Sequence, residues 1–107
     1  MAKHKEGKVE TYFKEQVEKH GGITRKAKWL CRRGCPDQFW AFPARSGSIY
    51  RVGVNFVAEN GLAEIKAPGE PLAPHQSREI AKLKSAGVTV EVLDSFEAVD
   101  KFIRRYA

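Results

Sequence analysis

Apolar residues recur along this chain at two spacings, and each spacing predicts a different kind of element. From residue 8 to residue 20 they follow a helical spacing, with Val9, Phe13 and Val17 on one stripe. The pair Gly21–Gly22 is expected to end that helix. Residues 23–30 and 37–42 have strand-like patterns and are separated by a turn. Residues 1–7 are polar and are expected to be flexible.

The second half of the chain repeats a strand-then-helix order. Residues 62–67 predict a strand, and a helix follows from Pro74, which suits a first helical turn, to Gly87. Val88, Val90 and Val92 then alternate as in a short strand, and residues 94–97 form a capping box that opens a last helix. This order predicts an α/β fold with a mixed sheet flanked by helices. Residues 43–60 are the hardest part of the chain to assign to a helix or a strand, although 49–57 could add a strand.

Composition limits the chain to one domain over residues 1–107, because this length allows one modest core and is too short for two. No apolar run approaches the roughly 20 residues that cross a bilayer, so we expect no membrane segment and a cytoplasmic location. Cys31 and Cys35 are too few for a disulfide framework and are expected to be free thiols.

The formal net charge of +6 suits a polyanionic partner such as DNA, although many basic proteins bind no nucleic acid. The position of the charge is more informative, because cations gather just before Asp37. A solvated strand edge, protected from aggregation by its charges, is the alternative interpretation. Trp29 lies between these cations in the sequence. The candidate DNA-binding residues are Arg25, Lys26, Lys28, Arg32 and Arg33.

Asp37, Glu64 and Lys66 form the most informative chemical set. Side chains alternate along a strand, so Glu64 and Lys66 project from the same side, roughly 6–7 Å apart, while Ile65 points into the core. If Asp37 ends a neighbouring strand, two carboxylates can bind a hard divalent cation beside the lysine. Such a site is the minimum for metal-assisted hydrolysis of a phosphodiester. A surface ion pair of Glu64 with Lys66 is the alternative.

Helix geometry selects two further polar residues. At about 100° per residue, Glu10 lies beside Val17 at the border of the buried stripe, whereas Glu15 and Glu18 face solvent. Gln76 shares the inward face of its helix with Ile80, and an inward glutamine needs polar partners. Glu10 could instead be a partly exposed helix acid, and Gln76 could be a half-exposed rim residue.

In their order along the chain, these motifs resemble the VRR-Nuc family of the PD-(D/E)-x-K nuclease superfamily, in its stand-alone phage and bacterial form. The resemblance extends from about Glu10 to the last helix. Ala73 departs from it, because that helix usually opens with a small hydroxyl residue. The matching elements are Glu10, Gly21–Gly22, Arg-Gly-Cys-Pro-Asp at 33–37, Glu64-Ile65-Lys66 and Gln76.

The resemblance implies a restriction-endonuclease-like core and a Mg²⁺- or Mn²⁺-dependent endonuclease. The implied metal ligands are Glu10, Asp37, Glu64 and the backbone carbonyl of Ile65. Lys66 and Gln76 complete the implied catalytic set, and a homodimeric Holliday junction resolvase is the expected function.

Other functions compete with this one. A basic DNA-binding module without catalysis and a nicking or flap-type nuclease are the alternatives. A zinc site is a further alternative, with Cys31, Cys35, His20 and His75 as candidate ligands, but the two cysteines have no second close pair of ligands beside them.

Overall fold

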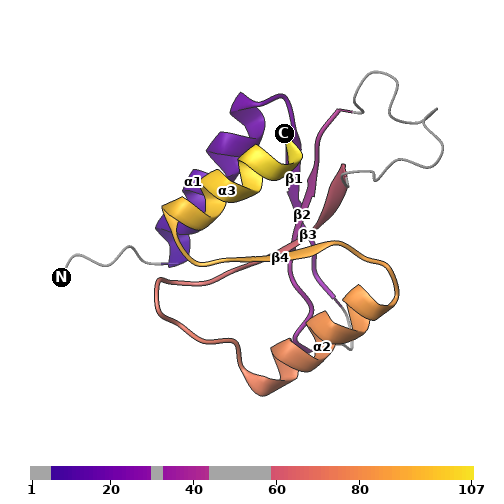
Figure 1. Cartoon of the computed structure of the whole chain (residues 1–107). Helices are drawn as coiled ribbons and strands as arrows, with labels where there is room; N and C mark the ends of the chain where they lie inside the picture. The colour runs from indigo at the N-terminus through magenta and orange to yellow at the C-terminus, as the bar shows by residue number, and fades with distance from the viewer. Residues whose placement is uncertain (1–5, 30–32, 44–58) are drawn as a thin grey trace.

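The computed structural model describes residues 6–29, 33–43 and 59–107, and the statements below concern these residues. Three helices and four strands follow one another in the order α1-β1-β2-β3-α2-β4-α3 (Figure 1). The elements are α1 (Glu6–Lys19), β1 (Ile23–Lys26), β2 (Gln38–Ala41), β3 (Asn60–Ile65), α2 (Pro74–Ser85), β4 (Val90–Leu93) and α3 (Phe96–Tyr106).

The four strands form one mixed sheet in the order β1-β2-β3-β4. The first two pairs are antiparallel, and β3 pairs with β4 in parallel because α2 crosses over between them. Helices α1 and α3 lie together on one side of the sheet, and α2 lies on the other (Figure 1). This arrangement confirms the prediction of a mixed sheet flanked by helices.

The hydrophobic core lies between the sheet and the α1–α3 layer. Val9, Phe13 and Val17 are fully buried there, which confirms the helical spacing read from the sequence. Trp40 of β2 is also fully buried, and its ring meets the ring of Phe102 edge-on at a centroid distance of 4.8 Å. This core holds α1 against the sheet, and so determines how side chains of α1 lie relative to those of the strands.

Two helix boundaries follow the predicted signals. Gly21 has a φ of 86°, the left-handed conformation that glycine adopts easily, and ends α1. The Gly22 N–H donates to the Val17 carbonyl at 2.9 Å and completes that cap. Ser95 opens α3 by accepting a hydrogen bond from the Ala98 N–H at 3.0 Å. The N-cap is Ser95 and the third helical position is Ala98, so the predicted capping box at 94–97 is not formed.

Several boundaries differ from the predictions. The first strand ends at Lys26, well before Leu30, because the chain leaves the sheet after the Ala27 N–H donates to the Asp37 carbonyl. In the fourth strand Leu93 is buried, whereas Val92, on the opposite face, is 38% exposed. Glu6 and Gly7 belong to α1, although residues 1–7 were expected to be flexible. The possible strand at 49–57 lies outside the described residues. No described helix has the length and apolar character needed to span a membrane.

Candidate active site

Glu64 and Lys66 lie on the face of β3 that points away from the main core. Their neighbours Ala63 and Ile65 are buried in that core, as strand alternation requires. Glu64 is only 9% exposed and Lys66 only 8%. The backbone N–H of Lys66 donates to the Leu93 carbonyl at 2.9 Å, so strand pairing continues one residue beyond β3. Both charged groups are therefore held on a rigid part of the sheet.

The Glu64 carboxyl group has a pKa well above its ordinary value. Burial raises its pKa to about 7, and the negative charges of Asp37, Glu6 and Glu70 add to the rise. The Lys66 ammonium opposes the rise without cancelling it. At neutral pH much of this carboxyl group is therefore protonated, mainly because of its burial, and a bound cation would favour the ionised carboxylate.

Gln76 holds Glu64 from the first turn of α2. Its side-chain oxygen accepts a hydrogen bond from the Ala73 N–H at 2.9 Å, and its amide nitrogen donates to Glu64 Oε2 at 3.2 Å. Ala73 provides no side-chain cap, as expected from the sequence. The backbone bond determines which end of the amide faces the carboxylate. The predicted inward orientation of Gln76 toward the acidic residues is confirmed.

Glu10 and Asp37 meet at a third residue, Lys26 of β1. The Lys26 ammonium nitrogen lies 3.5 Å from Glu10 Oε2 and 3.5 Å from Asp37 Oδ2. Burial alone would raise the pKa of Glu10, but Lys14 and Lys26 outweigh that effect and hold the pKa below its usual value. Lys26 thus sits between two predicted metal ligands, whereas the sequence suggested only a contact with DNA.

The acidic residues fall into two neighbouring groups, one around Lys26 and one around Glu64. Among the described residues, no three Asp, Glu, His or Cys side chains are close enough together to hold a metal ion. Carboxylate oxygens are nevertheless the donors that Mg²⁺ and Mn²⁺ prefer. Lys26 already places a positive charge between Glu10 and Asp37, and its side chain is 57% exposed and can move away. By this donor chemistry the residues fit a hard divalent cation.

Gln38 is a site residue that the sequence analysis missed. It is fully buried on β2, and its amide nitrogen donates to Glu10 Oε2 at 2.9 Å. Its side-chain oxygen is buried and has no hydrogen-bond partner in the described part of the chain. The signal was available, because Gln38 shares the core-facing side of the strand with Trp40, where an apolar residue is expected.

Replacing Gln38 by leucine should therefore impair function more than stability. The change frees Glu10 from its buried donor but also removes an unsatisfied acceptor, so the free energy of unfolding should change little or increase. If Glu10 acts in catalysis, DNA cleavage should fall about 10- to 100-fold, as for other residues that orient a metal ligand. Gln16→Leu on α1 is the control. Full cleavage activity in Gln38→Leu would contradict this role.

The remaining predicted residues differ in exposure and in their contacts. Arg25, Lys28 and Arg33 are exposed, as DNA contacts must be, and Arg32 lies outside the described residues. The Cys35 thiol donates to Glu79 Oε2 at 3.2 Å, and Cys31 is also outside the described residues. His20 contacts the Gln16 carbonyl of its own helix. No described contact supports the zinc alternative.

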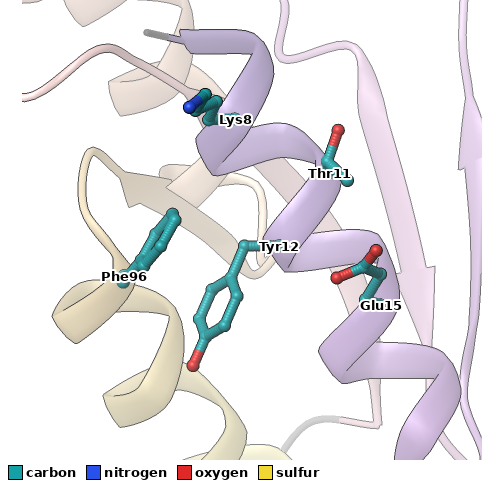
Figure 2. A pocket seen from close by; sticks show the side chains of 5 residues that line it. All are labelled: Lys8, Thr11, Tyr12, Glu15 and Phe96. Carbon is teal, nitrogen blue, oxygen red and sulfur yellow. The ribbon is translucent and has the colours of Figure 1, made fainter. Parts of the chain in front are cut away.

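A separate hollow of about 340 Å³ opens between α1 and the start of α3 (Figure 2). Tyr12 stacks on Phe96 there, with ring centroids 4.2 Å apart. None of the predicted site residues lines it, so it is distinct from the acidic site. The residues around it are Lys8, Thr11, Tyr12, Glu15 and Phe96.

Comparison with known proteins agrees with the fold. A solved structure described as "VRR_NUC domain" matches with a TM-score of 0.75 and 33% identity, over 95% of this chain and 97% of that one. "Putative nuclease p44" of Acyrthosiphon pisum secondary endosymbiont phage 1 is 40% identical over 91 residues, which are 85% of this chain and 84% of that protein. No family model matches the chain.

The mixed sheet with its three helices is a restriction-endonuclease-like fold. The chain belongs to the VRR-Nuc family.

Proposed function

We propose that this protein is a divalent-metal-dependent endonuclease that hydrolyses phosphodiester bonds in branched DNA. The preferred substrate is a four-way junction, the active form is a homodimer, and the protein works in the cytoplasm of a bacterial cell. The family and the relative named as a nuclease support hydrolysis of nucleic acid. The metal, the junction and the dimer go beyond these comparisons.

The observation that carries the proposal is the buried Glu64 carboxyl with its raised pKa. A pKa of about 7 in place of 4.5 means that ionising this group in the folded protein is costly. By linkage, the cost reaches about 3 kcal/mol at alkaline pH. Ionisation of this buried group opposes folding, whereas a bound cation would favour its ionised form. Perturbed acids of this kind mark functional sites.

Each residue has a role in the proposed reaction. Asp37 and Glu64 would hold Mg²⁺ or Mn²⁺, with Glu10 and the Ile65 carbonyl completing the ligands. When bound, the ion supplies an activated water and neutralises charge on the scissile phosphate. Lys66 stabilises the negative charge that develops on the phosphate in the transition state. Gln76 holds Glu64 in its orientation through the bond from its amide nitrogen.

The size of the domain supports recognition of DNA structure over DNA sequence. A chain of 107 residues that already builds a sheet and three helices has little surface left to read base edges in a groove. A two-fold symmetric dimer would present two such sites to two strands of a junction. The exposed cations Arg25, Lys28 and Arg33 would contact phosphates and orient the DNA.

The test is cleavage of a panel of DNA substrates with Mg²⁺, Mn²⁺ or EDTA, together with the molecular mass in solution. The panel contains a four-way junction, a flap, a splayed duplex, a nicked duplex and a linear duplex. We expect paired incisions in the junction, no products in EDTA, and the mass of a dimer. Preferred cutting of a flap or a single nick would replace junction resolution. DNA binding without cleavage under any metal would indicate a non-catalytic module.

A further inference from the structure

Trp29 stands out on the surface beside the proposed catalytic acids. It is 41% exposed, which is unusual for the largest apolar side chain, and it lies in the segment that joins β1 to β2. Its described neighbours in sequence are charged or small, and the exposed cation Lys28 precedes it directly. No part of the proposed reaction so far uses this ring.

The indole is fixed by its polar edge. Its N–H donates to the Pro36 carbonyl at 2.8 Å, and that carbonyl belongs to the peptide bond that joins Pro36 to Asp37. The ring is therefore hydrogen-bonded to the backbone directly before Asp37, a proposed catalytic carboxylate. Because its one donor is used by the protein, the indole has only its π faces and apolar edge to offer a ligand.

We propose that Trp29 is a stacking platform for a nucleobase with an unstacked face next to the scissile phosphate. This inference rests on the proposed function, because it places the scissile phosphate at Asp37. Base stacking on an aromatic ring tolerates any sequence and requires a base whose face is free. Bases inside a duplex are stacked on both faces, so the ring would select a junction, a fork or a single-stranded end. Trp29 would thus supply specificity for DNA structure.

The charges around the ring favour this occupant. Lys28 and Arg33 are exposed on either side of it in sequence, and Arg25 is exposed on β1. An aromatic ring among cations is the combination that binds single-stranded nucleic acid, since phosphates meet the cations while bases stack. An apolar protein partner would instead require the cations to be desolvated.

The chain offers a direct optical test. It has two tryptophans, and the other one, Trp40, is fully buried. In EDTA, where cleavage cannot occur, a short single-stranded oligonucleotide should quench the Trp29 part of the fluorescence. An oligonucleotide of the same length with abasic sites carries the same phosphates and should bind more weakly without that quenching. Equal quenching by both oligonucleotides would overturn the proposal.

Two substitutions separate stacking from a structural role. Trp29→Leu should weaken binding of the single strand about 5- to 100-fold, as the loss of one stacked base predicts. Trp29→Phe lacks the N–H that bonds to the Pro36 carbonyl but keeps a ring, so it should retain most of the affinity. Ile23→Ala, which removes an exposed apolar side chain from the neighbouring strand β1, should have no effect. Equal losses in the phenylalanine and leucine variants would overturn stacking.

The two proposals can fail separately. Cleavage of junctions without base-dependent quenching would reject the stacking platform and leave the nuclease intact. Base-dependent quenching without cleavage under any metal would reject the nuclease and leave base stacking on Trp29 intact. If Trp29→Leu does not fold, the wild-type quenching and the Trp29→Phe variant still decide the question.

Discussion

Replacing Asp37 by asparagine is expected to reduce DNA cleavage by at least about 100-fold while leaving DNA binding in EDTA intact or tighter. Asparagine keeps the shape of the side chain but removes the charge that a divalent ion requires. Loss of a direct ligand should cost more than the 10- to 100-fold typical of residues that only orient ligands. The measurement is single-turnover cleavage of a four-way junction in Mg²⁺, alongside binding of the same junction in EDTA.

Glu18→Gln is the matched control for this substitution. Glu18 is exposed on α1, and the change removes the same charge away from the site. Cleavage by this variant should equal that of the wild type, while any gain in DNA affinity from the added net positive charge should be shared. If Asp37→Asn cleaves as fast as Glu18→Gln, the acidic site does not catalyse the reaction.

Replacing Glu64 by glutamine is expected to abolish cleavage and to stabilise the metal-free protein at alkaline pH. Glutamine resembles the neutral acid that the folded state prefers. The folded pKa of about 7 exceeds the unfolded value of 4.5, so the folded protein binds more protons between these values. The wild type therefore loses stability as pH rises from 4.5 to 7, by up to about 3 kcal/mol. The variant escapes this loss.

Denaturant unfolding in EDTA at several pH values measures the effect. The difference in the free energy of unfolding between Glu64→Gln and the wild type should grow from pH 4.5 to about pH 7 and stay constant above that. Glu15→Gln, an exposed substitution on α1, should show no such growth. A difference that does not change with pH would mean that the Glu64 carboxyl is not perturbed in the folded protein.

The fold was largely predictable because its helices and central strands are amphipathic. Val9, Phe13 and Val17 repeat at a spacing that only a helix can bury on one face, and the structure buries all three. The end of β1 was not predictable, because it depends on a contact between distant segments. The Ala27 N–H pairs with the Asp37 carbonyl, and the chain then turns away from the sheet.

The candidate site was predictable in its residue types but not in its pairing. Strand alternation placed Glu64 beside Lys66, and helix geometry placed Gln76 inward. The position of Lys26 between Glu10 and Asp37 arises from the packing of α1 against β1, which no local pattern encodes. Gln38 was missed because its position on the same side of the strand as Trp40, which indicates burial, was not used.

Anomalous scattering from manganese in crystals of this protein is the most direct test of the account. We expect one or two manganese peaks in contact with the carboxylates of Asp37 and Glu64, and the Lys26 ammonium moved away from the pair it now bridges. Manganese bound elsewhere, with Lys26 still between Glu10 and Asp37, would contradict it.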